Sequence, residues 1–487
     1  MIITLYIILL TFIIIYDIVR KPYVPFDYLR LFHIFFCLEY IITPIVLLIY
    51  PDEEWRFAIF APEGKYSLAV FGVILLGYVG VFLGMKYSKP NKVKGSILIL
   101  KWRLNEKKFL FIVTMLLLFV IMNLFIYSLS FGGLVNLAIS GYLIRRGTLI
   151  DESGIFVYFK FFAEGLPWIT LLLTSFCINF SSGNMKKSRG FSNTVLTAYI
   201  LITISLIFSL IFALGTGGRG NLIVTILPCV YLLINKYRRF FSVKQIILVT
   251  VTLLLAYWVT IYARPYMYAL GSTAINKGSF ALNDITALAQ GYIEKASGEN
   301  VESDFKTSIV GFFSNLDHTV TATYLVMSNP EHFNFPRIFL DYFRALISLI
   351  PGIHYSTFDL FHVTKNPSML VNDFLGFGSL VPPGWIANAY VNGWYPLVFL
   401  WGFIAGYIGG KIEYTIRINI AIAPWMEGIY IFMYFYWNLI FFHGESTKLV
   451  LSNIPFVIII FTLLQWLTIS KRHYKIFKTG NRKVIIA

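Results

Sequence analysis

Four arginines lie where an anionic ligand could reach them, next to apolar stretches of the chain. Arg145 and Arg146 are adjacent in a polar segment. Arg219 lies in the glycine-rich segment 215–220, and Arg264 follows another apolar stretch. A guanidinium group stays charged and binds phosphate oxygens through two N–H groups at once, and glycines let backbone N–H groups approach an anion. These arginines are therefore a candidate phosphate site, and the alternative is that each one extends to lipid headgroups.

Two pairs of polar residues could supply acid–base chemistry. Asp317 is adjacent to His318, and His443 precedes Glu445 in a short polar turn between apolar stretches. A general base needs a suitable pKa and a hydrogen-bond path to its substrate. Adjacent residues on a helix point about 100° apart, so Asp317 and His318 do not form a dyad by themselves. The alternative for both pairs is that they are solvated loop residues.

The motifs of nucleotide-dependent and metal-dependent enzymes are missing from the sequence. It contains no GxxxxGK[ST], no HExxH and no Asp-x-Asp segment. The three cysteines, Cys37, Cys177 and Cys229, are far apart inside apolar stretches, which indicates neither a disulfide framework nor a cysteine-based metal site. We therefore expect chemistry that needs no cofactor and no metal.

The composition predicts a polytopic membrane protein. Of 487 residues, 57% are hydrophobic and only 13% are charged, with a mean hydropathy of +0.72. These values leave too little polar surface for a soluble enzyme and too much apolar side chain for a disordered chain. The net charge of +16 is expected to fix orientation in the lipid bilayer, so we expect no nucleic-acid partner.

Windows of about 20 apolar residues predict an all-α fold of about eleven transmembrane helices, which would position these side chains. The seventh predicted span, 221–235, is short. The ninth, 393–412, has a stripe of Gly402, Gly406 and Gly410, which favours close helix packing. The predicted spans are 2–19, 29–50, 67–85, 109–129, 155–180, 194–214, 221–235, 245–262, 393–412, 424–442 and 451–469.

The basic residues predict the orientation and three consecutive parts. About 26 Lys and Arg fall in one set of short loops and about 14 on the other side, so the first set is cytoplasmic. Residues 1–262 form an N-terminal bundle of about eight spans, 263–392 a large outer loop, and 393–487 the last spans with a basic tail. Within the loop, 305–327 and 335–350 are amphipathic helix candidates, and the second lies in the interface or re-enters the membrane.

Three segments resemble the O-antigen polymerase (Wzy) family, the repeat-unit polymerases of bacterial surface polysaccharides. They are the outer turn LGTGGRG at 214–220, the segment FLDYFRALISLIP at 339–351, and the segment PPGWIANAYVNG at 382–393. Many relatives have a glutamate where this chain has Asn388, and often a basic residue where it has Gly352. The architecture of spans and a large outer loop is also similar to that family over most of the chain.

The resemblance implies a GT-C-like membrane glycosyltransferase in the bacterial inner membrane, with its active site on the periplasmic side. It would transfer a growing chain from undecaprenyl diphosphate to the non-reducing end of an incoming lipid-linked repeat unit, without metal or nucleotide. The partners would be the undecaprenyl-diphosphate-linked oligosaccharide and a chain-length regulator. The assigned roles are diphosphate binding for Arg145, Arg146, Arg219 and Arg264, acid–base chemistry for Asp317 and His318, and acceptor or substrate binding for Asn388 and His443.

Two other functions remain open. An O-antigen ligase shares the spans, the large loop and the outer arginines, although it usually has a His-Asn/Ser motif where this chain has Asn388-Ala389. A flippase of lipid-linked units would be expected to have charged residues within its spans, of which Glu164 and Glu427 are the examples here. The aromatic residues Trp385 and Tyr390 could stack on sugars or anchor the chain at the membrane interface.

Overall fold

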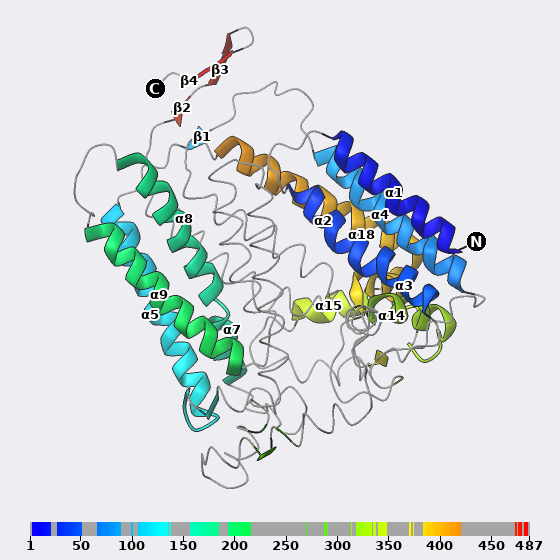
Figure 1. Cartoon of the computed structure of the whole chain (residues 1–487), viewed down its shortest axis with the longest axis horizontal. Helices are drawn as coiled ribbons and strands as arrows, with labels where there is room; N and C mark the ends of the chain where they lie inside the picture. The colour runs from blue at the N-terminus through cyan, green and yellow to red at the C-terminus, as the bar shows by residue number, and fades with distance from the viewer. Residues whose placement is uncertain are drawn as a thin grey trace. The chain divides into compact units, whose positions relative to one another are not determined.

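A computed structural model describes several of the predicted spans and part of the predicted outer loop (Figure 1). The described residues are 2–20, 27–50, 66–88, 99–100, 106–134, 136–137, 156–184, 193–215, 269, 287–288, 290, 313, 318–333, 335–337, 339–347, 370–371, 374, 383–419, 473–474, 476–479 and 482–485. The chain divides into two compact units, one formed by Met1–Ile112 with Ile309–Ala487 and the other by Val113–Ser308. The predicted division at 262 and 392 stays a prediction.

Within the described residues, five helices are long and apolar enough to cross a membrane, as expected for a membrane protein. They are Ile2–Val19, Tyr28–Ile49, Ser67–Ser88, Phe109–Leu129 and Gly384–Tyr414. The first four agree closely with predicted spans. The predicted spans 221–235, 245–262, 424–442 and 451–469 lie outside the described residues.

The first unit begins with three of these spans. They are α1 (Ile2–Val19), the continuous run of α2 (Tyr28–Phe36), the π-helical η1 (Cys37–Ile42) and α3 (Thr43–Ile49), and then α4 (Ser67–Ser88). The same unit contains α14 (His318–Ser328), α15 (Leu340–Ile347) and α18 (Gly384–Asn419).

The second unit contains most of α5 (Glu106–Leu129), with α7 (Phe156–Ala163), α8 (Leu166–Asn184) and α9 (Asn193–Gly215). The single span predicted at 155–180 is wrong, because a turn at Glu164 and Gly165 separates α7 from α8. Pro167 explains the break, since it has no N–H group for the carbonyl of Ala163 but fits the first turn of a new helix. α8 and α9 pack together, with Thr170 and Ser205 hydrogen-bonded between them.

In the described part of the first unit, four short strands form two antiparallel pairs, although the sequence predicted none. β1 (Ile99–Leu100) pairs with β2 (His473–Tyr474), and β3 (Ile476–Thr479) pairs with β4 (Arg482–Ile485). The membrane-crossing candidates among the described residues are all helical.

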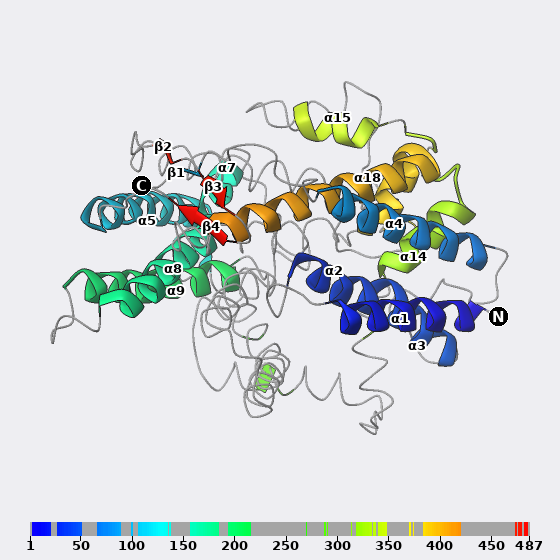
Figure 2. The same cartoon turned by 90° about the horizontal axis from the view of Figure 1, so that it is seen from above.

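α4 and α18 run side by side in both views and make the most extensive helix contact in the described part of the chain (Figures 1 and 2). Glycines allow this approach. A Cβ at Gly80 would lie 2.5 Å from the carbonyl oxygen of Phe399, and one at Gly402 would lie 2.7 Å from that of Gly77. A Cβ at Gly406 would overlap the main chain of Val81. The close packing predicted from the glycine stripe is therefore confirmed.

α18 begins nine residues before the predicted span at 393–412, and it is broken near its N-terminal end. Gly393 and Trp394 have non-helical backbone angles, and Pro396 follows inside the helix. The predicted end of the outer loop is thus helical, and the ninth span belongs to the longer part of α18 after the break. The loop candidates 305–327 and 335–350 contain the shorter helices α14 and α15.

Candidate functional site

The break in α18 exposes main-chain carbonyl groups to which a loop segment binds. Pro396 has no N–H group for the carbonyl of Asn392, four residues earlier. The N–H of Phe339 donates to that carbonyl instead, at 3.1 Å. The N–H of Arg337 donates to the neighbouring carbonyl of Val391 at 3.0 Å. The segment that enters α15 is therefore attached to the broken helix through its backbone.

Four buried polar residues form a continuous network at this break, which we call the junction network: Arg337, Asp341, Asn388 and Asn392. Arg337 Nη2 donates to Asp341 Oδ1 at 2.9 Å, and its Nε lies 2.8 Å from Asp341 Oδ2. Asn392 Oδ1 accepts from the main-chain N–H of Asp341 at 3.3 Å. Asn392 Nδ2 donates to Asn388 Oδ1 at 3.1 Å and to its carbonyl at 2.9 Å.

The junction network is buried and electrically balanced. Arg337, Asp341 and Asn388 are each 5% exposed, and Asn392 is 0% exposed. One guanidinium faces one carboxylate, so the network has no net charge. The N–H of Asp341 belongs to the first turn of α15, where a helix lacks internal acceptors, and Asn392 supplies the acceptor. The arrangement is suited to holding two segments in one geometry rather than to binding a diphosphate.

Four aromatic rings contact one another near the break in α18, and we call them the aromatic patch: Phe335, Tyr390, Trp394 and Tyr395. The ring of Phe335 stacks on Tyr390, with centroids 5.5 Å apart and planes 15° apart, and also contacts Trp394 at 5.5 Å. Tyr395 meets Tyr390 edge to face at 5.4 Å. Trp394 is 50% exposed and Tyr395 is 44% exposed. The patch therefore offers two half-exposed rings at the break in α18.

Apolar packing supports this site from α14 and from α15. Tyr342 on α15 places its ring against Trp401 of α18, with centroids 5.0 Å apart. Burial raises the pKa of the Tyr342 hydroxyl well above its ordinary value, and the nearby charge of Asp341 raises it further, so the phenol stays neutral. Under the aromatic patch, one core cluster joins α14 to the first half of α18, and it contains Ala322, Leu325, Val326, Phe333, Leu370, Val371, Ala387 and Val391.

Of the residues proposed from sequence, Asn388 is placed at this site. Its side-chain oxygen accepts from Asn392, so at least one face of the amide is engaged within the protein. His318 is the first residue of α14. The other proposed residues, Arg145, Arg146, Arg219, Arg264, Asp317 and His443, lie outside the described residues, and their roles stay predictions. Asp341 and Asn392 were missed, because no local spacing marks two residues that meet from 51 positions apart.

Two other sequence interpretations change with the structure. Trp385 is fully buried, and its ring packs against Tyr40 and over Gly77, so it cannot stack on a sugar. Glu164 lies in the turn between α7 and α8 rather than within a continuous span. Glu427 lies outside the described residues.

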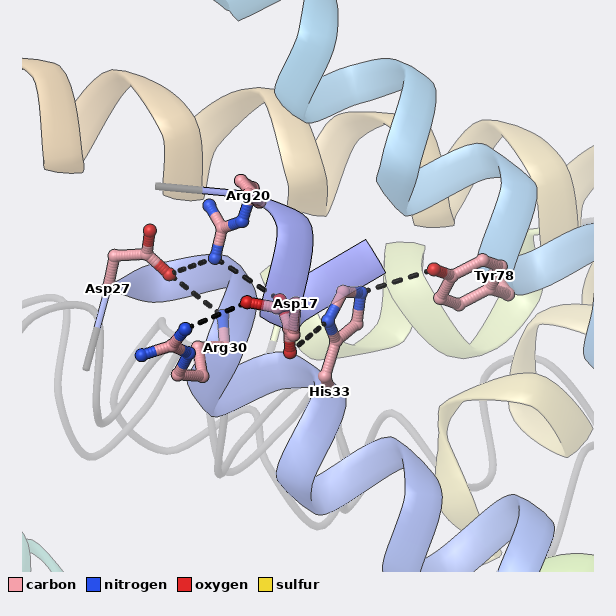
Figure 3. Close-up of polar contacts among 6 residues, drawn as sticks. All are labelled: Asp17, Arg20, Asp27, Arg30, His33 and Tyr78. Atoms are coloured by element: carbon pink, nitrogen blue, oxygen red, sulfur yellow. Dashed lines mark hydrogen bonds and ion pairs between the residues drawn. The ribbon is translucent and has the colours of Figure 1, made fainter. Parts of the chain in front are cut away.

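A second polar network joins α1, α2 and α4, and Figure 3 shows its six residues. Arg20 lies between two carboxylates, with its Nη2 at 2.6 Å from Asp27 and 3.4 Å from Asp17. The imidazole of His33 lies between Asp17, at 2.8 Å, and the hydroxyl of Tyr78, at 3.2 Å. Burial lowers the pKa of Arg20, but the hydrogen bond and charge of Asp27 outweigh that effect and raise it.

This second network explains how α1 is joined to α2 across the residues between them. Arg30 Nη2 donates to the main-chain carbonyl of Asp17 at 2.9 Å. Asp27 caps α2 by accepting from the N–H of Arg30 at 3.0 Å. Arg20 and Arg30 are among the basic residues counted in the loops predicted to be cytoplasmic, and the sequence assigned them no other role. Asp17 and His33, ionisable residues within predicted apolar spans, were the missed signal.

One more ionisable residue lies within a span. Glu39 is in the π-helical segment η1, and its Oε2 is buried without a hydrogen-bond partner within the described residues. π-Helical turns and intramembrane carboxyl groups are both associated with functional positions. No group of three or more His, Cys, Asp or Glu residues that could hold a metal ion occurs in the described part of the chain.

Compared with protein-family models, with curated proteins and with solved structures, the chain matches none of them.

Proposed function

We propose that the protein polymerises lipid-linked oligosaccharide repeat units of a bacterial surface polysaccharide on the periplasmic side of the inner membrane. One observation carries this proposal. Two of the three segments that resemble O-antigen polymerases, 339–351 and 382–393, meet at the break in α18 through the bonds of Asp341 and Phe339 to Asn392. Segments that work on one substrate must lie together, so their contact supports a shared site.

The proposed reaction is a glycosyl transfer between two lipid-linked substrates. A hydroxyl at the non-reducing end of the acceptor unit attacks the anomeric carbon of the donor chain. The new C–O bond forms as the bond from that carbon to the diphosphate oxygen breaks, and undecaprenyl diphosphate leaves. The hydroxyl proton passes to a general base, for which Asp317 and His318 are the candidates.

The leaving diphosphate gains negative charge as its bond to carbon breaks. Fixed guanidinium groups would stabilise that charge more in the transition state than in the bound donor. The junction network does not serve this purpose, because Arg337 is balanced by Asp341. Arg145, Arg146, Arg219 and Arg264 therefore keep the proposed diphosphate role, and the junction site is assigned to the sugars.

Transport of lipid-linked units is the second candidate function, and Glu39 is the observation that favours it. A carboxyl group within an apolar span is a typical feature of proton-coupled transporters. An O-antigen ligase is the third candidate, because it uses the same donor with a different acceptor. The three functions differ in the glycolipids that accumulate when the gene is removed.

The test is the glycolipid ladder of cells in which the gene is deleted and then supplied as wild type, Arg219→Ala or Arg239→Ala at matched protein level. Arg239 is the control, because it lies in a loop predicted to be cytoplasmic. In the deletion strain, and with Arg219→Ala, the surface glycolipid should carry a single repeat unit in place of the long polymer. Arg239→Ala should restore the long ladder.

Other ladders would overturn the proposal in identifiable ways. If no surface glycolipid carries repeat units and the finished polymer stays on undecaprenyl diphosphate, the protein would be a ligase. Accumulation of lipid-linked single units on the cytoplasmic side would indicate a transporter. A normal ladder for Arg219→Ala would remove Arg219 from the site while leaving the activity itself to be decided by the deletion.

A further inference from the structure

The break in α18 places a tryptophan in a backbone conformation that favours glycine. Trp394 has φ 57° and ψ −156°. Among the described residues, only Phe339, with φ 60°, is another non-glycine residue with positive φ. Both residues lie at the junction, because Phe339 donates its N–H to Asn392, two positions before Trp394. Strain of this kind persists only where the surrounding structure enforces it, and it gathers at functional sites.

The position of glycine makes this strain informative. Gly393 precedes Trp394 and has an extended φ of −176°, so its glycine is explained by close packing, since a Cβ there would lie 2.8 Å from that of Leu397. The chain therefore has its glycine beside the strained position and its largest side chain at it. If position 394 needed only this backbone conformation, glycine would fit it best. We therefore expect the indole side chain to have a function.

The surroundings of the indole favour a neutral ligand with an apolar face. One side of Trp394 contacts Phe335, and half of the residue remains exposed beside Tyr395. The charge of Arg337 is balanced by Asp341, so the junction network presents no net charge that would attract a phosphate group. A pyranose ring has an apolar C–H face that fits against an aromatic ring and hydroxyl groups at its edge.

We propose that Trp394 is a sugar-binding residue, whose indole stacks on a pyranose ring of the lipid-linked acceptor while Phe335 supports it from behind. This inference rests on the proposed polymerase function and deepens it. It assigns the acceptor saccharide to the junction between the loop segment 335–341 and the break in α18. The strained backbone holds the ring toward the substrate.

The experiment compares Trp394→Gly, Trp394→Phe and Trp394→Leu in full-length protein purified in detergent. The acceptor is the lipid-linked unit extracted from the deletion strain. Trp394→Gly should raise KM for the acceptor roughly twofold to tenfold, with kcat largely unchanged, since one stacked ring is lost. Its thermal unfolding midpoint should equal or exceed that of the wild type, because glycine relieves the strain. Trp394→Phe should restore most of the affinity, and Trp394→Leu should not.

Tyr87→Ala is the matched control, because Tyr87 is a 69% exposed aromatic residue at the end of α4. It should leave KM for the acceptor unchanged. The inference is overturned if Trp394→Leu matches the wild type, which would indicate an apolar anchor only. It is also overturned if Trp394→Gly leaves KM unchanged, or if all three variants lose stability in proportion to lost volume, which would make the ring structural.

Equilibrium binding of the same lipid-linked unit to protein in lipid nanodiscs separates this inference from the proposed function. Binding that weakens in Trp394→Gly, without turnover by the wild type, would keep the sugar site and reject the polymerase. Turnover that is indifferent to residue 394 would keep the polymerase and reject the site. Neither binding nor turnover by the wild type would reject both.

Discussion

The side chain of Asn392 accepts a hydrogen bond from the main-chain N–H of Asp341 at 3.3 Å, joining α18 to the first turn of α15. The same residue also offers its carbonyl to Phe339, because Pro396 cannot bind it. Asn392 thus accepts hydrogen bonds from the loop segment through both its main-chain carbonyl and its side chain. A proline that breaks the helix and an asparagine four residues before it create one docking point.

Asn392→Asp should destabilise the protein by about 3 kcal/mol near neutral pH. The carboxylate keeps an acceptor for Asp341 but loses the two N–H donors that serve Asn388, and it buries an unbalanced charge at a fully buried position. Protonation of the introduced carboxyl group removes this buried charge. The defect should therefore shrink as the pH falls toward about 4, where the unfolded chain also binds the proton.

Thermal unfolding of the purified protein at several pH values measures this effect. Asn136→Asp is the control, because Asn136 is exposed and the same substitution there adds a solvated charge. It should shift the unfolding midpoint little at any pH. A midpoint for Asn392→Asp that is independent of pH, or equal to that of the control, would contradict the described network.

The ion pair of Arg337 and Asp341 should show strong energetic coupling. Arg337→Met or Asp341→Leu alone leaves one buried charge without its counter-ion, which costs about 3–5 kcal/mol. The double variant removes both charges, so it should lose much less stability than the sum of the single variants. A double-mutant cycle on unfolding midpoints measures the coupling. Additive losses would mean that the two side chains act separately.

The sequence predicted the apolar helices well and the broken one poorly. Four spans could be predicted because about 20 consecutive apolar residues form a local signal. The first half of α18 contains Asn388 and Asn392, so it resembled a loop. These amides are tolerated in the helix because Asn392 bonds to Asn388 and to the main-chain N–H of Asp341, and the contact with Asp341, 51 positions away, leaves no trace in a sequence window.

The candidate site was predictable only in part, for a similar reason. Asn388 was singled out within a recognisable motif, but its partner Asn392 and the contact with Asp341 depend on the fold. Trp385 was proposed as a sugar platform from its residue type, and it is a core residue instead. Trp394 could not be selected from sequence, because its strained backbone is visible only in the structure.

The packing of α4 against α18 should tolerate no side chain at Gly406. A Cβ there would overlap the main chain of Val81, which cannot move aside as a flexible side chain would. Gly406→Ala should cost about 2 kcal/mol by this overpacking. Gly72 on α4 is the control, because a Cβ there would meet nothing within 4 Å. Gly72→Ala should be neutral or stabilise by about 0.5–1 kcal/mol.

The two alanine variants are compared by thermal unfolding in detergent and by the amount of protein in the membrane. Lower values for Gly406→Ala alone are expected. Equal behaviour of the two variants would mean that α4 and α18 do not approach as closely as the glycines allow.

The second polar network gives a prediction that separates a helix cap from a charge. Asp27 is 0% exposed, caps α2 through the N–H of Arg30, and pairs with Arg20. Asn is as good a cap as Asp, so Asp27→Asn should remove only the charge, at about 2 kcal/mol. Asp27→Ala should lose about 1 kcal/mol more, because it also removes the cap. Unfolding midpoints should therefore fall in the order wild type, Asp27→Asn, Asp27→Ala. If the two variants have the same midpoint, the cap contributes nothing and the ion pair alone holds α1 to α2. If Asp27→Asn equals the wild type, the charge of Arg20 is balanced by Asp17 alone, and the shorter contact to Asp27 is not the stabilising one.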